Sequence, residues 1–211
     1  MNLVPNGDFE LGNTLFSSDY TFAGSNTDQS QYTVTATPDT WNTAFVSASD
    51  HTPGALQTQM FVGNGADTAS RVWFSSAPIV VTPDTDFFFE AWVMNLCCRA
   101  GFGGTTVPTL VNPAVLSFFA NDTLLGTKTT SSLGEWEPLG TNWNSGASTS
   151  VTLKLVNANL LVLGNDFAVD DIFLGTETSI PVIPEPQTYA LMMAGLGLLG
   201  FAMRRRGRLG R

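Results

Sequence analysis

Residues 87–94 have the sequence FFFEAWVM and predict a strand in the interior of a β-sheet. Successive side chains of a strand point to opposite faces, so one face of this strand is wholly apolar and the other carries a single charge, at Glu90. A strand that is apolar on nearly both faces is typical of a position covered on both sides. The stretch therefore indicates a β-fold built around a central strand.

The same two-residue period recurs on both sides of this stretch. In residues 151–155, three apolar residues alternate with Thr and Lys, which is the pattern of a strand with one buried face. Turn-forming sequences such as TPG at 52–54 and NSG at 144–146 separate such segments. Many short strands at this spacing predict an all-β sandwich or barrel, with no helix needed before residue 189. The expected strands are residues 31–37, 43–48, 56–62, 71–75, 78–82, 87–94, 114–120, 124–129, 135–139, 151–155 and 167–174.

Composition divides the chain into four parts. Residues 1–175 are enough for one β-sandwich domain with a substantial core, and residues 176–188 are expected to form a linker. Residues 189–203 are uncharged and mostly apolar, and residues 204–211 are basic. As a helix, residues 189–203 would rise only about 22 Å, less than the roughly 30 Å hydrocarbon core of a bilayer, so they predict a marginal transmembrane segment.

Charge is distributed unevenly between these parts. All eighteen acidic residues precede Thr188, whereas five of the nine basic residues follow Met203, so residues 1–187 carry 14 net negative charges. Nucleic-acid binding needs a lysine and arginine footprint to neutralise phosphates, and this composition excludes it as a function. Divalent cations are the more plausible charged partners of so acidic a domain.

A short motif separates the acidic and basic parts. Pro184, Glu185 and Pro186 precede the apolar residues 189–203, which include AL at 190–191 and GLGLLG at 195–200, and the basic cluster Arg204, Arg205 and Arg206 follows. This arrangement resembles the PEP-CTERM sorting signal of Gram-negative bacteria. An ordinary tail anchor is the alternative, although such an anchor has no need of the Pro-Glu-Pro step.

The resemblance implies a route for the protein. An exosortase-type enzyme would recognise the signal at the inner membrane and remove the tail, so that a mature chain ending near Pro186 reaches the cell surface or the extracellular polysaccharide matrix. The positive-inside bias agrees, because it keeps the arginine cluster cytoplasmic and residues 1–186 outside the cytoplasm. The opening MNLVPNG lacks the basic region and apolar core of an export signal, so we expect a start codon assigned too far downstream or a signal already removed.

Three further stretches resemble one kind of sandwich. Residues 2–10, NLVPNGDFE, resemble the first strand of galactose-binding-like jelly-roll domains, a group that includes many carbohydrate-binding modules, and residues 164–172, GNDFAVDDI, resemble their last strand. Residues 113–121 are similar to an internal hairpin of the same exported proteins. The expected fold is therefore an all-β jelly-roll sandwich followed by a single short C-terminal hydrophobic helix. An unrelated sandwich with similar termini is the alternative.

The jelly-roll resemblance implies a metal site. In that family a structural calcium ion often joins the first and last strands through a glutamate and an aspartate, and the matching residues are Glu10 with Asp170 or Asp171. Ca²⁺ takes oxygen ligands and suits an acidic exported domain. Neighbouring strand residues point to opposite faces, so at most one of the two aspartates is expected to ligate. The alternative is that these carboxylates make only surface hydrogen bonds.

Carbohydrate binding is the second expectation. Sugar sites combine flat aromatic faces with a few polar groups that fix orientation. Trp73 and Trp92 lie in apolar runs and are predicted to be core residues, whereas Trp41 and Trp143 lie beside Asn and Thr in expected loops. Trp41 and Trp143 are therefore the candidate sugar-binding residues, and packing is the alternative for both.

Catalysis has little support in the sequence. His51, between Asp50 and Thr52, is the only histidine, and no metal-ligand spacing or phosphate-binding glycine loop is present. We therefore predict no catalytic residue and an exported, non-enzymatic surface or matrix protein that binds or scaffolds polysaccharide. A carbohydrate-active hydrolase or lyase on the same fold, and a matrix protein with no specific ligand, are the alternatives.

Cys97 and Cys98 are adjacent. Disulfides usually join Cα atoms about 4.4 to 6.8 Å apart, whereas neighbours across a trans peptide lie about 3.8 Å apart. A bridge between the two, two buried thiols, and pairing with another chain all remain open.

Overall fold

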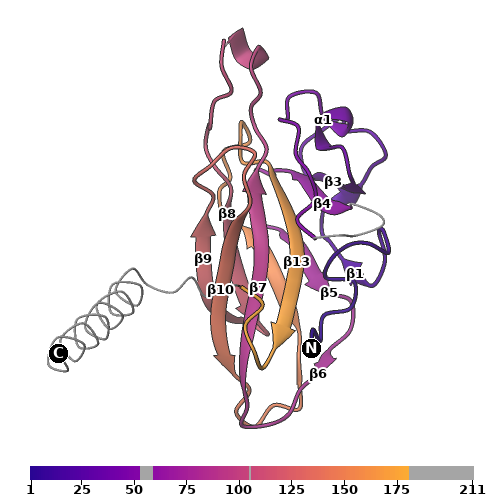
Figure 1. Ribbon diagram of the computed structural model, residues 1–211, viewed down its shortest axis with the longest axis vertical. Helices are drawn as coiled ribbons and strands as arrows, with labels where there is room; N and C mark the ends of the chain where they lie inside the picture. The colour runs from indigo at the N-terminus through magenta and orange to yellow at the C-terminus, as the bar shows by residue number, and fades with distance from the viewer. Residues whose placement is uncertain (53–58, 105, 181–211) are drawn as a thin grey trace, which may run out of the picture. The chain divides into compact units, whose positions relative to one another are not determined.

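The protein folds as a two-layer β-sandwich. The structure, a computed structural model, describes residues 1–52, 59–104 and 106–180, and residues 1–179 form one compact unit. One layer is a five-stranded sheet in the order β1-β5-β12-β8-β9, and the other is a six-stranded sheet in the order β10-β7-β13-β4-β3-β2 (Figure 1). This confirms the predicted all-β jelly-roll class. The predicted C-terminal helix lies outside the described residues.

Most expected strands are present, some with different bounds. The five-stranded sheet contains β1 (Phe16–Ser17), β5 (Arg71–Ser75), β8 (Val115–Ala120), β9 (Thr123–Thr129) and β12 (Leu153–Asn157). The six-stranded sheet contains β2 (Thr21–Phe22), β3 (Gln31–Thr35), β4 (Met60–Asn64), β7 (Asp86–Asn95), β10 (Glu137–Asn144) and β13 (Phe167–Gly175). Two short strands, β6 (Ile79–Val80) and β11 (Ser150–Val151), pair with each other.

Strand β7 occupies the interior position that its sequence predicts. It pairs with β10 on one side and with β13 on the other, antiparallel to both. Its inner face packs against the five-stranded sheet, where the rings of Phe89 and Phe118 lie 4.7 Å apart between centroids. Apolar residues from both sheets meet in one continuous core, and burial of this apolar area supplies most of the free energy that favours folding.

The first residues of the chain lie along the last strand. The backbone N–H of Leu3 donates to Leu174, and that of Ile172 donates to Gly7. A side chain at Gly7 would place its Cβ 2.0 Å from the Ile172 carbonyl oxygen, so only glycine permits this approach. Residues 2–10, expected to form a strand, instead follow a series of turns beside β13.

Two short helical turns that were not predicted lie in the described residues, α1 (Pro38–Trp41) and the 3₁₀ turn η1 (Phe102–Gly104). Proline suits the first turn of a helix because its missing N–H would have no partner there, and Asp39 adds a favourable negative charge at the same end. Residues 43–48, expected to form a strand, make only an isolated bridge from Phe45 to Cys97. This segment covers the outer face of the six-stranded sheet and forms a second apolar cluster there.

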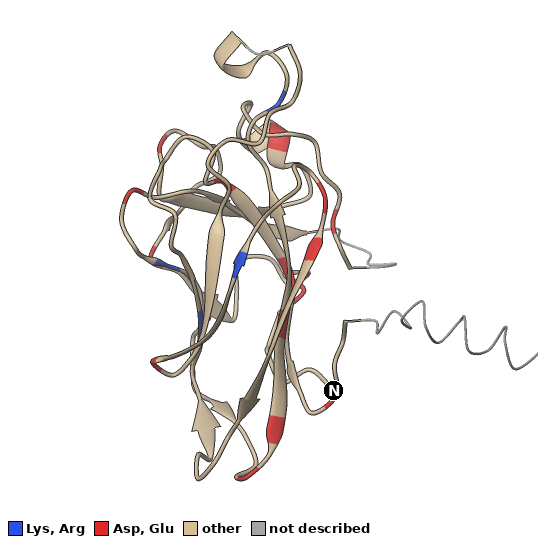
Figure 2. Ribbon diagram, turned by 90° about the vertical axis from the view of Figure 1, so that its left-hand side faces the viewer, with Lys and Arg blue, Asp and Glu red and all other residues tan. Residues whose placement is uncertain are grey.

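The domain is acidic, and its helices are short. Acidic residues are spread over the described domain with few basic residues between them (Figure 2). None of the helices in the described part of the chain is long and apolar enough to cross a membrane. The predicted transmembrane segment, residues 189–203, and the basic tail, residues 204–211, fall outside that part.

Candidate functional site

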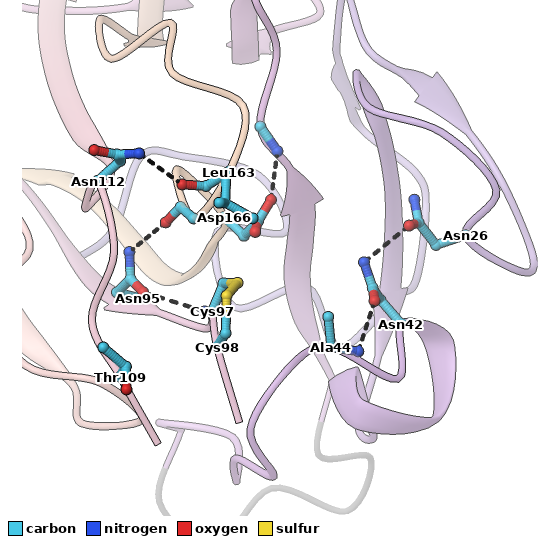
Figure 3. Close-up of a disulfide and its surroundings, with 12 residues drawn as sticks. Asn26, Asn42, Ala44, Asn95, Cys97, Cys98, Thr109, Asn112, Leu163 and Asp166 are labelled. Carbon is cyan, nitrogen blue, oxygen red and sulfur yellow. Dashed lines mark hydrogen bonds between the residues drawn. A yellow bond between two sulfur atoms is a disulfide. The ribbon is translucent and has the colours of Figure 1, made fainter. Parts of the chain in front are cut away.

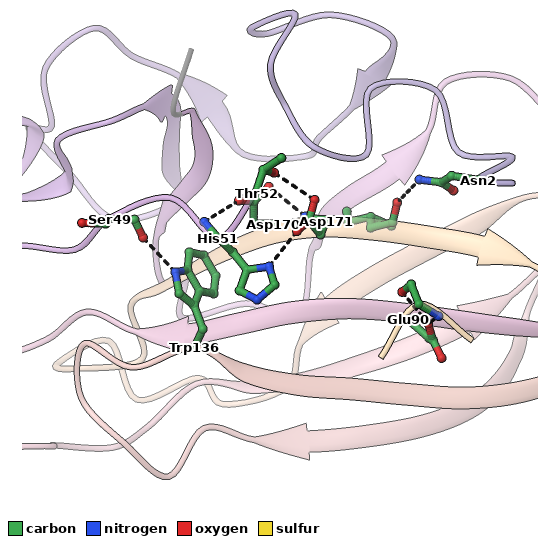
Figure 4. A network of polar contacts seen from close by, with 10 residues as sticks. Asn2, Ser49, His51, Thr52, Glu90, Trp136, Asp170 and Asp171 are labelled. Carbon is green, nitrogen blue, oxygen red and sulfur yellow. Dashed lines mark hydrogen bonds and ion pairs between the residues drawn. The ribbon is translucent and has the colours of Figure 1, made fainter. Parts of the chain in front are cut away.

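A loop lies on the outer face of the six-stranded sheet and is held there by His51 (Figure 4). The backbone N–H of His51 donates to Asp170 Oδ2 at 3.0 Å, and its Nδ1 lies 2.6 Å from Asp171 Oδ2. The hydroxyl of Thr52 donates to Asp171 Oδ1 at 2.9 Å. Residues from positions 51 and 52 therefore meet residues 170 and 171 although about 120 residues separate them in sequence.

Both aspartates reach the same loop because β13 is irregular at this point. The pairing of β13 with β7 shifts register between Asp170 and Phe173, and Asp171 has a φ of 46°. A β-bulge breaks the alternation of side chains along a strand. The sequence-based expectation that the two carboxylates point to opposite faces is therefore wrong.

Two tryptophans enclose the histidine ring. His51 stacks on Trp92 with 3.9 Å between centroids and an interplanar angle of 20°, and it meets Trp136 edge-on at 5.8 Å. The indole N–H of Trp136 donates to the carbonyl of Ser49 at 2.8 Å, so it also fixes the loop. Both tryptophans are partly exposed. We call His51, Trp92, Trp136, Asp170 and Asp171 the His51 site.

Asp170 and Asp50 form a buried carboxyl pair beneath this site. Asp170 is fully buried, and burial, followed by the nearby Asp50 and Asp171 carboxyl groups, holds the pKa of Asp170 well above its usual range. Both carboxyl oxygens of Asp50 are buried with no N–H or O–H donor. Two carboxyl groups that lie close together cannot both ionise at low cost, so this environment favours the protonated form of Asp170.

The imidazole of His51 remains accessible while its partners fix its orientation. The His51 and Asp171 side chains are 22% and 27% exposed. A carboxylate that accepts from one ring nitrogen of a histidine leaves the other nitrogen free to exchange a proton or accept a hydrogen bond. The site thus offers aromatic edges, one imidazole and one carboxylate to a molecule approaching the sheet.

The predicted calcium ligands each accept hydrogen bonds from the protein. Glu10 Oε1 accepts the backbone N–H of Gln59 at 3.0 Å, whereas the Asp170 and Asp171 carboxylates contact the loop at His51 and Thr52. Within residues 1–52, 59–104 and 106–180, no group of three or more His, Cys, Asp or Glu side chains is arranged to hold a metal ion. The calcium site stays a prediction.

The two candidate sugar-binding tryptophans are in different environments. Trp41 ends α1, is only 7% exposed, and donates its indole N–H to Ala23 at 2.8 Å, so its ring is enclosed by the second apolar cluster. Trp143 is on strand β10 rather than in a loop, partly exposed, and packs beside Phe87. Trp73 is buried as predicted, whereas Trp92, predicted to be core, is part of the His51 site.

The adjacent cysteines form a disulfide with each other (Figure 3), the first of the three alternatives. They lie at the end of β7, where Cys97 N–H donates to the Asn95 side chain and Cys98 exchanges two backbone hydrogen bonds with Thr109. Both are buried in the second apolar cluster. The bridge is therefore part of the outer layer that also carries the His51 site.

Comparison with known families identifies the C-terminal motif. The family described as "PEP-CTERM protein-sorting motif" matches residues 182–206, which include the predicted Pro184, Glu185, Pro186, Arg204, Arg205 and Arg206. The chain carries this motif, and the motif indicates export sorted by an exosortase. These residues lie outside the described part of the structure. No curated protein matches the chain by sequence.

Solved structures resemble the sandwich. A cyclase from Fischerella sp. TAU in complex with 4-(1H-indol-3-yl)butan-2-one has a TM-score of 0.53 and 11% identity, covering 84% of this chain and 98% of that chain. TmCBM61 in complex with β-1,4-galactotriose has a TM-score of 0.49 and 14% identity, covering 84% and 99%. A family 16 carbohydrate-binding module has a TM-score of 0.47 and 14% identity, covering 82% and 99%. At these identities the cyclase similarity shows the fold alone.

Proposed function

We propose that this chain is a non-enzymatic protein of the cell surface or extracellular matrix that binds polysaccharide at the His51 site. The observation that carries the proposal is the grouping of Trp92, Trp136 and His51 beside the Asp171 carboxylate on one sheet face. Aromatic rings contact the apolar C–H surface of a sugar, and carboxylate or imidazole groups hydrogen-bond its hydroxyls. Sorted export brings such a site to where polysaccharide is found.

The charge of the domain restricts the class of sugar. Residues 1–187 carry 14 net negative charges, and the site itself adds the Asp171 carboxylate. A field of this sign repels polyanions and raises the local concentration of cations. We therefore expect a neutral or amino-sugar polymer rather than one rich in uronic acids.

A glycan array probed with the full chain in detergent tests this proposal. The array should hold neutral, amino-sugar and uronic-acid polysaccharides, and binding is expected to the first two classes. Trp136→Ala and His51→Ala should each weaken binding at least tenfold, whereas Trp143→Ala, which changes a ring packed against the core between the sheets, should bind as the parent does. A blank array with protein that is folded by circular dichroism contradicts the proposal and favours a matrix protein without a specific ligand. Loss of binding in Trp143→Ala alone would instead favour the sequence-based candidate.

A second candidate function, a polysaccharide hydrolase or lyase, rests on the His51–Asp171 pair. A carboxylate 2.6 Å from Nδ1 fixes the orientation of the His51 ring, which is the arrangement that a general base requires. Incubating the full chain with a glycan that it binds, and measuring new chain ends, tests this candidate. Chain ends that appear with the parent and not with His51→Gln would establish activity, and their absence would leave binding as the function.

A further inference from the structure

Glu90 is a buried carboxylate that accepts hydrogen bonds from the C-terminal end of the sandwich. It lies on the outer face of β7 and is 2% exposed (Figure 4). Ser179 donates to its Oε2 through both the backbone N–H and the hydroxyl, each at 2.6 Å, and the hydroxyl of Thr178 donates to its Oε1. Within the described residues, no basic side chain forms a salt bridge with Glu90. We call Glu90, Thr178 and Ser179 the Glu90 clasp.

Thr178 and Ser179 satisfy the buried carboxylate of Glu90, and Glu90 in turn holds these two residues on the sandwich. A buried carboxylate is costly unless it is hydrogen-bonded, and hydrogen bonds to a charged acceptor are stronger than neutral ones. Glu90 is therefore stable at this depth only while Thr178 and Ser179 cover it. The chain leaves β13 at Gly175, which pairs with Phe88, and its next residues are retained on the sandwich at Glu90.

This contact shortens the connection between the sandwich and the sorting motif. Pro184 follows Ser179 by five residues and follows Gly175 by nine. Five extended residues span at most about 18 Å and nine at most about 32 Å. A folded unit of this length has a radius of gyration of about 16 Å. With the clasp closed, the longest possible connection to the motif is therefore only about as long as the radius of gyration of the sandwich.

We propose that Glu90 is a positioning residue for processing of the sorting motif. By holding Thr178 and Ser179 it limits the chain between the sandwich and Pro184 to five residues, so that the processing enzyme reaches the motif efficiently only when the clasp opens. The inference rests on exosortase-sorted export and is independent of polysaccharide binding. It assigns Glu90 a role in the timing of release.

The test measures trimming of the full chain in a host that contains the exosortase, by pulse-chase labelling and separation of trimmed from untrimmed protein. Glu90→Gln removes the charge at constant volume and should be trimmed several-fold faster. A four-residue Gly-Ser insertion after Ile180 should accelerate the parent to a similar extent. The insertion combined with Glu90→Gln should give little further gain, because both changes lengthen the same connection.

Glu137 provides a matched control. Its carboxylate accepts from Ser131 N–H at 2.6 Å, from Ser132 N–H at 2.8 Å and from the Ser131 hydroxyl at 3.0 Å. These hydrogen bonds resemble those of Glu90 but lie away from the chain's exit, and Glu137 differs in also forming a salt bridge with Lys128 at 2.7 Å. Glu137→Gln should be trimmed at the parent's rate. Equal acceleration in Glu137→Gln and Glu90→Gln would overturn the proposal, because general loosening of the fold would then explain both.

A second clasp variant and a host without the exosortase serve as further controls on the trimming experiment. Should Glu90→Gln fail to fold, the double variant Thr178→Ala/Ser179→Ala removes two of the three donors and leaves Glu90 in place, and it should also be trimmed faster. Parent-like trimming of the folded clasp variants and of the insertion would refute the role of Glu90. In a host that lacks the exosortase no chain should be trimmed, and trimming there would contradict sorted export itself.

Discussion

The two faces of the six-stranded sheet are buried by different means. On β7, Phe89 on the inner face and Glu90 on the outer face are both almost inaccessible to solvent. Phe89 is covered by the opposite sheet, whereas Glu90 is covered by hydrogen bonds from Ser179 and Thr178. Residues of the inner face therefore become exposed only when the whole domain unfolds. Residues of the outer face, such as Glu90, can become exposed when the segment that covers them moves away.

The largest effect is expected on the inner face. Phe89→Ala should destabilise the domain by about 3–5 kcal/mol, because it removes a fully buried ring and leaves a cavity between the sheets. Urea unfolding followed by tryptophan fluorescence measures the change. A loss below about 1 kcal/mol would mean that the sheets pack less closely than the contact with Phe118 indicates.

A buried carboxyl group beside β13 should make stability depend on pH. Burial raises the pKa of Asp166 to about 7, against the opposing hydrogen bond from Gly65 N–H. The folded state then holds this proton more tightly than the unfolded chain, so its contribution is complete below about pH 4 and is lost as the pH rises through about 7. Three pKa units correspond to about 4 kcal/mol at most.

Asp166→Asn removes this titration and should leave the variant more stable than the parent above pH 7. Unfolding curves of both proteins at pH 4, 5.5, 7 and 8 measure the difference. The gap between them should widen from pH 4 to about pH 7 and level off above that. A constant gap would show that Asp166 is ionised, and therefore hydrated, in the folded protein.

Calcium would change the outer face if the predicted ligands Glu10 and Asp170 or Asp171 hold it. Ca²⁺ at a hundredfold excess over its Kd should add about 2.7 kcal/mol to the free energy of unfolding. Thermal melts with calcium and then with chelator measure the gain, and Glu10→Gln should abolish it. An unchanged Tm in the folded parent protein rules out the site.

The smallest effect is expected at the loop that crosses the outer face. His51→Ala removes the contact with Asp171 and the stack on Trp92, while the backbone bond to Asp170 can remain. The cost should be about 1–3 kcal/mol, the range for hydrogen bonds to charged groups, and it should be local. Hydrogen exchange should quicken in residues 46–52 and not in β7, and equal loss of protection in both would contradict the difference between the faces.

The inner face was predictable from sequence because its side chains obey strand periodicity. The alternation predicted for residues 87–94 and 151–155 is reproduced in the burial of β7 and of β11 with β12, where Val151, Leu153 and Leu155 are all buried. The sorting motif was equally readable, because its residues are contiguous.

The outer face was not predictable, for three physical reasons. The bulge at Asp170 breaks the alternation on which the sequence argument relied. His51 gains its partners from a strand about 120 residues away, which no local pattern can show. Trp41 and Trp143 have polar neighbours in sequence, yet Trp41 ends a helical turn and is buried in the second apolar cluster, and Trp143 lies on a strand. Polar neighbours indicate where the chain meets water, not where an indole ring points.

The position of β13 has a consequence for biosynthesis. This strand is the last one in the part of the chain that the structure describes, yet it lies between β7 and β4 and pairs with the first residues of the chain. A polypeptide interrupted anywhere before residue 167 lacks the centre of its larger sheet and cannot close its core. The domain can therefore reach its native structure only after its synthesis is complete. Prematurely terminated chains would expose unpaired strand edges and be degraded by proteases.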